Sequence, residues 1–211
     1  MVVTVTKRNR YGNGFGKGGI VRKTMKSSGG VKTSKLISIT KLSPLQIKQL
    51  SQITSDKDTM KHIGMGKIWT RKDIVDYIRD ERGEIHKKLN ERKYFTYVML
   101  DGSGKVIGFI AGRKNPRLIG VLANDMETSN DLLMRMFISR RETGKGYGKK
   151  IIALFENVYK GIIGKDNARL ISDIAPNNMA SIKIHESNGF ELRGEINYPN
   201  GTVLLRYVKK I

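Results

Sequence analysis

A glycine-rich turn between a strand-like and a helix-like segment constrains the fold of this chain more than any other feature. Apolar and polar residues interleave along residues 133–138, and Gly144, Gly146 and Gly148 follow at every second position. Apolar residues then recur at helical spacing over residues 151–158. Glycines let successive backbone amides turn inward, and a helix start adds unpaired donors and about +0.5 of dipole charge. The segment therefore predicts a binding site for an anion such as a phosphate.

Three other phosphate-binding motifs do not match this turn. A P-loop needs Ser or Thr directly after its lysine, whereas Lys149 is followed by Lys150. The dinucleotide-binding fingerprint needs the spacing GxGxxG, and the HRD and DFG motifs of protein kinases do not occur in the sequence. A glycine-rich hairpin or linker without a ligand is the alternative that the turn alone leaves open.

Length and composition narrow the class of protein. A chain of 211 residues is long enough for one domain with a buried core and a tail. It contains no cysteine, which excludes disulfides, thiolate catalysis and cysteine-ligated metals. The three histidines, His62, His86 and His185, are far apart in the sequence, so a zinc site is not expected. No apolar run approaches the roughly 20 residues that cross a bilayer, so we expect a soluble intracellular protein, cytoplasmic or associated with nucleic acid.

Positive charge is concentrated near the N-terminus. The formal net charge is +21, and eleven basic residues but no acidic residue precede Asp56. We expect residues 1–34, rich in Gly, Ser and basic residues, to be a disordered arm, and residues 35–211 to form the folded domain. The arm is either a tail that binds RNA or DNA through residues 7–35, with Tyr11 and Phe15 stacking on bases, or a solubilising extension. Such a charge favours a polyanionic partner, either nucleic acid, anionic lipid or a phosphorylated cofactor, and disfavours a strongly cationic substrate.

The rest of the chain alternates strand-like and helix-like segments. Ser43-Pro44 is a helix start signal, and Asp101 to Gly104 join two β-rich runs as a hairpin. The region 115–130 fits no element, but it contains the acidic residues Asp125 and Glu127. The expected elements are a strand from residue 35 to 42, helices from 44 and over 71–91, strands at 94–100, 106–111 and 133–138, a helix from about 148, a strand at 168–175, a helix at 178–187, and a terminal hairpin of 190–196 with 202–208.

Two segments of the second half are similar to the GNAT acyltransferases, which acylate amines with acetyl-CoA. Residues 138–148, ISRRETGKGYG, resemble the family's V-x-P-x-x-[QR]-G-x-G-x-G loop. Residues 178–190, NMASIKIHESNGF, resemble its N-x-x-[AS]-I-x-x-Y-x-x-x-G-F segment. Together with Trp69-Thr70, the sequence of residues 178–190 resembles most the branch that acetylates N-terminal amines of ribosomal proteins. The resemblance implies an α/β (α+β) GNAT fold, in which helices flank a mixed, mostly antiparallel, twisted sheet of six to seven strands.

The resemblance also implies how acetyl-CoA is bound. The loop amides would receive the pyrophosphate, with Lys145 and Lys149 adding attraction. The strand before the loop would carry a bulge, diverge from its neighbour and expose its backbone to the pantetheine arm. The cofactor-binding residues implied in this way are Met136, Phe137, Ile138, Thr143, Gly144, Lys145, Gly146, Tyr147, Gly148, Lys149, Asn178 and Ser181. Thr143 departs from the family pattern, because a Gln or Arg is usual there.

The catalytic residues are less clearly marked. His185 stands where many members have a tyrosine that protonates the departing CoA thiolate, and an imidazolium could do the same. Members of the ribosomal branch often lack the tyrosine and rely on proximity, with water or a serine as relay. For the general base, Glu127 and Asp173 are the candidates.

Three functions follow from these features. The first is an acetyl-CoA-dependent N-acetyltransferase that acts on an amine of a protein. The second is a GNAT-fold protein with little or no activity, which the basic arm attaches to nucleic acid or to an assembled particle. The third is transfer to a small amine such as an aminoglycoside or a polyamine, which the positive charge of the chain disfavours.

Overall fold

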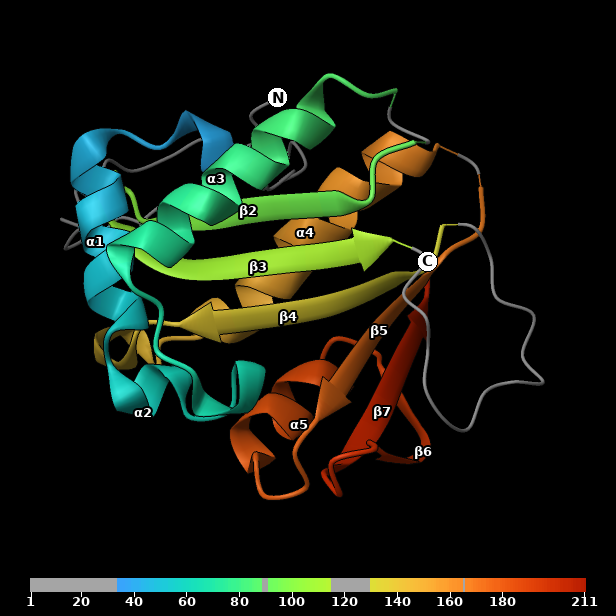
Figure 1. Ribbon diagram of the computed structural model, residues 1–211. Coiled ribbons are helices and arrows are strands. Elements are labelled where there is room, and N and C mark those ends of the chain that lie inside the picture. The colour runs from blue at the N-terminus through green and yellow to red at the C-terminus, as the bar shows by residue number, and fades with distance from the viewer. Residues whose placement is uncertain (1–33, 89–90, 115–129, 165) are drawn as a thin grey trace, which may run out of the picture.

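Seven strands of the described chain form one mixed sheet in the order β1-β2-β3-β4-β5-β7-β6 (Figure 1). The computed structural model describes residues 34–88, 91–114, 130–164 and 166–211. The expectations for the arm, for Tyr11 and Phe15, and for Asp125 and Glu127 lie outside these residues. In chain order the elements are β1 (Lys35–Ser38), η1 (Ile39–Lys41), α1 (Pro44–Thr54), α2 (Lys57–Met60), η2 (Gly64–Gly66), α3 (Arg71–Ile85), β2 (Tyr94–Leu100), β3 (Val106–Lys114), β4 (Leu132–Ile138), η3 (Arg140–Glu142), α4 (Tyr147–Ile163), β5 (Arg169–Ile174), α5 (Met179–Glu186), β6 (Glu191–Asn197) and β7 (Val203–Lys210).

One pair of neighbouring strands departs from the antiparallel pattern. β4 and β5 run parallel, and their pairing covers only Leu132 with Leu170 and Leu133 with Ile171. Beyond Leu133 the two strands separate, as the diverging ribbons in Figure 1 show. The other neighbours pair antiparallel. The expected mixed, mostly antiparallel sheet of six to seven strands is confirmed.

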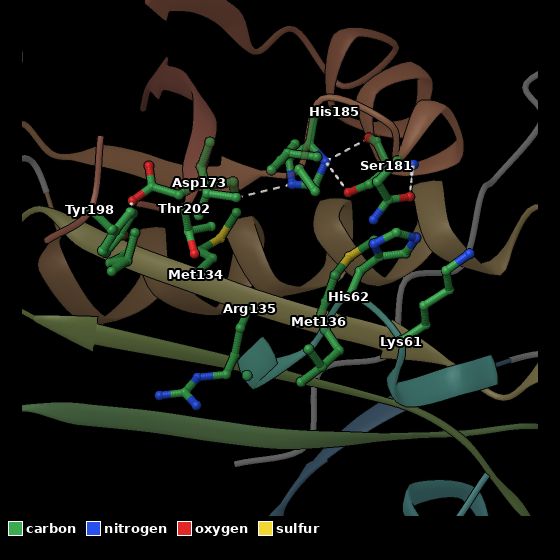
Figure 2. Close-up of a pocket in the computed structure, with 18 of the residues that line it drawn as sticks. Lys61, His62, Met134, Arg135, Met136, Asp173, Ser181, His185, Tyr198 and Thr202 are labelled. Atoms are coloured by element: carbon green, nitrogen blue, oxygen red, sulfur yellow. Dashed lines mark hydrogen bonds between the residues drawn. The ribbon is translucent and has the colours of Figure 1, made fainter. Parts of the chain in front are cut away.

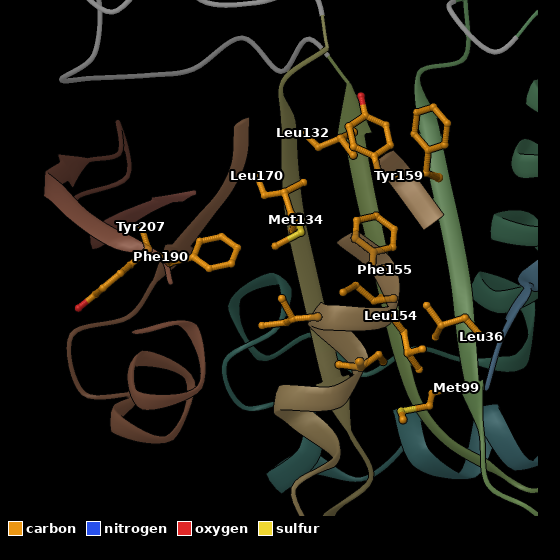
Figure 3. Packing of buried hydrophobic residues seen from close by; sticks show 14 of the residues in the cluster. Leu36, Met99, Leu132, Met134, Leu154, Phe155, Tyr159, Leu170, Phe190 and Tyr207 are labelled. Atoms are coloured by element: carbon orange, nitrogen blue, oxygen red, sulfur yellow. The ribbon is translucent and has the colours of Figure 1, made fainter. Parts of the chain in front are cut away.

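The sheet has a hydrophobic core on each face. On one face, Phe109 of β3 stacks on Phe137 of β4 with ring centroids 5.0 Å apart, and Trp69 meets both rings edge-on. Helices α1 and α3 cover this face. On the other face, α4 packs Leu154, Phe155 and Tyr159 against the strands (Figure 3). Side chains alternate between the faces of a strand, so β4 contributes Phe137 to the first core and Met134 to the second.

Local signals explain where most elements begin and end. Ser43 and Thr70 both form capping boxes at the starts of α1 and α3, which confirms the expected helix start at Ser43-Pro44. The expectation that the second helix continues to Glu91 is wrong, because α3 ends at Ile85. The Arg92 guanidinium donates to the carbonyl of Ile85 at 2.6 Å, so the returning chain caps the helix end. The first strand is also shorter than expected, because the Ser38 hydroxyl accepts from the amide of Thr40 and turns the chain into η1.

Within the ranges that the structure describes, no helix is long and apolar enough to cross a membrane.

Candidate active site

The separation of β4 from β5 opens a cavity of about 480 Å³ in the middle of the sheet (Figure 2). Its floor and sides come from β4, β5 and α5, and its outer wall comes from the segment after α2 and from the β6–β7 turn. The lining residues are 61–64, Arg113, 133–136, 172–175, Asn178, Ser181, His185, Tyr198, Asn200, Thr202 and Leu204.

The glycine loop lies on the surface next to this cavity rather than in its lining. Gly144 and Gly146 have φ values of 75° and 77°, a left-handed conformation that favours glycine. Gly148 has a different role, because a Cβ there would lie 2.6 Å from Cδ1 of Ile184, so it lets α4 approach α5 closely. Within the described chain, none of the amides of residues 144–149 donates a hydrogen bond. These free amides at the start of α4 give the anion-binding geometry that the sequence predicts.

Charges around the loop are partly compensated. The Lys145 ammonium lies 2.9 Å from the Glu142 carboxylate, and Lys105 reaches the same carboxylate at 3.6 Å. Lys149 is exposed and forms no ion pair with any described residue. The hydroxyl of Thr143 donates to the carbonyl of Arg140 at 2.7 Å and so stabilises the turn before the loop. The loop groups that remain available to an anion are therefore its backbone amides and Lys149.

The edge of β4 is open toward β5 over residues 136–138, as the resemblance implied, but it has no bulge. The register of β4 with β3 is continuous from Gly108 opposite Ile138 to Lys114 opposite Leu132. The opening arises instead from the divergence of β5, which leaves the β5-facing backbone groups of β4 without a strand partner in the described chain. Unpaired strand backbone can bind an extended ligand as an added strand would.

His185 is buried, with 3% of its surface exposed. Its Nδ1 lies 2.8 Å from the carbonyl oxygen of Ser181, so Nδ1 carries a hydrogen and donates it. Its Nε2 lies 3.0 Å from Oγ of Ser172 and can accept that hydroxyl's hydrogen. Burial lowers the pKa of His185 below its ordinary 6.5, against a smaller opposite effect of the Ser181 carbonyl. At neutral pH the ring is thus uncharged, with no proton at Nε2 to donate.

Asp173 is buried in an ion pair. The Arg206 guanidinium donates to both of its oxygens, Nε at 2.8 Å and Nη2 at 2.9 Å. The Tyr198 hydroxyl donates to the same carboxylate at 2.9 Å. Burial, followed by the nearby negative charge of Asp173, raises the pKa of Tyr198 to about 12, so Tyr198 stays protonated at neutral pH. Asp173 therefore fixes the position of Tyr198 in the cavity wall, and both of its oxygens already have donors.

The fold brings together several residues that the sequence did not single out. His62 and Lys61 enter from the segment after α2, and Arg113 and Arg135 from β3 and β4. Partial burial and the charge of Lys61 lower the pKa of the exposed His62 below 6.5. No spacing in the sequence links these residues, since they meet only when α2 packs beside β4. Among the residues that the sequence singled out, Met136, Asp173, Asn178, Ser181 and His185 line the cavity, and Glu127 lies outside the described residues.

Comparison with known proteins identifies the class. Residues 37–191 match the family described as the acetyltransferase (GNAT) domain, and the chain belongs to this family of N-acetyltransferases, whose acyl donor is acetyl-CoA. No curated protein matches the sequence.

Solved structures of GNAT enzymes share the fold at low sequence identity. RimL, the ribosomal L7/L12 alpha-N-protein acetyltransferase in complex with coenzyme A, has a TM-score of 0.62 at 15% identity, covering 84% of this chain and 94% of that one. Spermidine N-acetyltransferase from Vibrio cholerae, with CoA and spermine, has a TM-score of 0.60 at 14% identity, over 84% and 95%. Aminoglycoside acetyltransferase AAC(6')-Ib, with coenzyme A and kanamycin, has a TM-score of 0.61 at 16% identity, over 84% and 94%. These three names cover a protein, a polyamine and an aminoglycoside, so the fold alone does not choose the acceptor.

Proposed function

We propose that this chain transfers the acetyl group of acetyl-CoA to an amine of a protein. The observation that carries the proposal is the cavity between β4 and β5, which lies between the open edge of β4 and a wall of polar side chains from separate elements. Holding two reactants side by side removes much of the entropic cost of their reaction.

The residues present fit acetyl-CoA. The free amides of residues 144–149, with Lys149, would hold the pyrophosphate at the start of α4. The open backbone of residues 136–138 would pair with the amides of the pantetheine arm, and Asn178 and Ser181 would contact the same arm from α5. When bound, acetyl-CoA supplies an activated acyl group as a thioester.

His62 is the general base that the geometry favours. It lines the cavity from the segment after α2, and in Figure 2 it projects beside Met136, the residue at the open edge of β4. Its lowered pKa keeps the imidazole neutral at physiological pH, so it can take the proton of an arriving ammonium group. The oxygens of Asp173 are engaged by Arg206 and Tyr198, which makes it a weaker candidate, and Glu127 stays a prediction from the sequence.

On the thiolate side, His185 suits a positioning role. Its Nε2 fixes the hydroxyl of Ser172, which lines the cavity from β5. The half-buried hydroxyl of Ser181 lines the same cavity and would relay a solvent proton to the departing thiolate. In this arrangement, His185 orders the hydroxyl groups and does not itself donate the proton.

One experiment tests the function. Purified full-length protein is titrated with acetyl-CoA at moderate salt, because a basic protein also attracts CoA nonspecifically at low salt. Release of CoA thiol is then followed with a panel of acceptors: peptides with free N-termini, spermidine and kanamycin. We expect saturable binding and faster turnover with peptides. Faster turnover with spermidine or kanamycin would contradict the protein acceptor, and absence of saturable binding would contradict the cofactor.

We also propose that the basic arm associates with RNA or DNA. The support is the run of eleven basic residues without an acidic residue before Asp56. Affinity for RNA and DNA is measured over a salt series with and without residues 1–34. Deletion should weaken binding and flatten its salt dependence, and unchanged values in both would contradict the association.

A further inference from the structure

We infer that the acceptor amine belongs to an acidic peptide segment, because cations from three separate elements, none of which forms an ion pair with a described residue, surround the acceptor side of the cavity. This inference rests on the proposed acetyltransferase function and specifies the substrate class of its site.

The ionised groups that line the cavity are mostly positive. Lys61, Arg113 and Arg135 are all exposed lining residues. The carboxylate among the described lining residues is that of Asp173, and Arg206 neutralises it from below, with both side chains at most 5% exposed. The described part of the cavity therefore presents three cations and no uncompensated anion.

Several basic residues of the described surface are compensated by carboxylates. Lys67 pairs with Asp73 at 3.3 Å, Lys145 with Glu142 at 2.9 Å, and Lys209 with Glu156 at 2.6 Å. In the described ranges, no carboxylate lies within 4 Å of the charged groups of Lys61, Arg113 or Arg135. Other exposed basic residues, such as Lys48, Lys72 and Lys149, also form no ion pair with a described residue, but they do not line the cavity. Lys61, Arg113 and Arg135 are distinguished by lining one cavity together, where a single ligand can reach them.

Two of the cations are neighbours in the sheet. Arg113 lies opposite Leu133, and Ala111 lies opposite Arg135, so the two arginines are diagonal neighbours on the same face. Lys61 comes from the segment after α2, and Figure 2 shows it and Arg135 projecting on different sides of Met136. A ligand that meets both positions carries more than one anionic group, spread over a length that a single carboxylate does not cover. Consecutive Asp or Glu side chains after a free amine meet this requirement.

The charge also excludes the polycations on which two of the structural neighbours act. Spermidine and kanamycin bring several ammonium groups, and placing like charges beside Lys61, Arg113 and Arg135 is unfavourable. The same field helps the chemistry with an acidic peptide, because nearby cations favour the neutral form of the reacting amine. Acidic side chains supply the attraction that the amine itself lacks.

The test uses the full-length chain and three otherwise identical peptides with free N-termini, beginning Ser-Asp-Glu, Ser-Asn-Gln or Ser-Arg-Arg. Peptide affinity is measured with CoA bound, and transfer is measured in a separate reaction with acetyl-CoA as the acetyl donor. Arginine replaces lysine so that the N-terminus is the reactive amine, and mass spectrometry locates the acetyl group. We expect the acidic peptide to bind at least about tenfold more tightly than the neutral one at moderate salt, and the basic peptide to bind most weakly. Equal affinities, or preference for the basic peptide, would overturn the inference.

Variants separate the cavity from the basic arm, which also attracts acidic peptides. Arg113→Ala with Arg135→Ala should remove most of the preference, whereas Lys48→Ala with Lys72→Ala, an equal charge change at exposed positions of α1 and α3, should preserve it. Arg113→Glu with Arg135→Glu should reverse the preference toward the basic peptide, a gain that misfolding cannot produce. Preference unchanged in both arginine variants would overturn the inference. Binding preference without acetyl transfer to any amine would contradict the proposed function, whereas acetyl transfer without a preference for the acidic peptide would overturn the inference alone.

Discussion

The glycine loop at the start of α4, which lies outside the lining of the cavity, and the cavity wall that carries Lys61, Arg113 and Arg135 are built differently. The loop uses main-chain amides from six consecutive residues, 144–149. The wall uses side chains that come from a turn after a helix, from two strands and from a distant hairpin. The first construction depends on local backbone conformation, and the second depends on the complete fold.

Because of this difference, the site for the acyl donor and the wall that faces the acceptor tolerate different substitutions. A backbone site needs particular glycines at particular spacing, so it tolerates few changes if it is to keep one ligand. A side-chain wall can change charge by single substitutions without disturbing the strands beneath it. Enzymes that share one fold and one acyl donor can therefore accept amines that belong to acceptor molecules of opposite net charge.

The largest expected effect concerns the buried ion pair between Asp173 and Arg206 in the cavity wall. Arg206→Leu would leave the buried Asp173 carboxylate without its partner and should lower the free energy of unfolding by about 3–5 kcal/mol. Urea denaturation measures the change. Arg193→Leu is the matched control, because its ion pair with Glu191 is partly exposed and should cost less than about 1 kcal/mol. Equal losses in the two variants would show that the buried pair does not support the wall.

The second prediction tests the glycine loop at the start of α4. Gly146→Asp places a carboxylate at the helix start and a side chain at a φ of 77°, so the loop must shift or repel the pyrophosphate. Acetyl-CoA affinity should fall about 100-fold, which corresponds to about 2.7 kcal/mol. Calorimetric titration measures it. Gly161→Asp, the same substitution at an exposed position near the end of α4, should leave the affinity within about twofold if the effect is local.

The third prediction tests the acceptor side by its pH dependence. His62→Gln should lower kcat by roughly 10- to 100-fold, because Gln cannot take a proton. The lowered pKa of His62 means that wild-type kcat/KM falls only as pH drops through that pKa, below 6.5, and the variant should lose this step. Rates with a peptide acceptor across this range measure it. His86→Gln, at the exposed end of α3, should behave like wild type, and retention of the step in His62→Gln would assign it to another group.

The smallest effect concerns His185. Because burial lowers its pKa in the folded state, its contribution to stability is complete above 6.5, the ordinary histidine pKa, and is lost as pH falls below it. Relative to His185→Gln, wild type should lose on the order of 1 kcal/mol between about pH 7.5 and pH 5.5. Denaturation at both pH values measures the difference. A wild type that gains stability on acidification would mean that His185 is charged in the fold, as a direct proton donor requires.

The sequence predicted the elements around the glycine loop well, but it did not predict which side chains from distant segments meet in the cavity wall. The strand, the glycine turn and the helix of residues 132–163 follow from alternation, glycine spacing and helical periodicity, which are all local signals. Ser181 and His185 were singled out because residues 178–190 resemble a segment of the GNAT family, and the structure places both on α5. His62 and Arg135 are 73 positions apart and carry no joint pattern, so only the packing of α2 beside the sheet reveals them. The bulge expected in β4 was wrong because divergence of β5 alone opens the same edge.

The close approach of α4 to α5 at Gly148 has a mechanical consequence. With only a hydrogen atom at that position, Ile184 rests directly on the first turn of α4, in a place where even a methyl group would be 2.6 Å from its Cδ1. A displacement of that first turn toward α5 would therefore press on Ile184, which lies on the same helix as Ser181 and His185. An anion bound at the start of α4 would in this way influence the position of Ser181 through one side-chain contact.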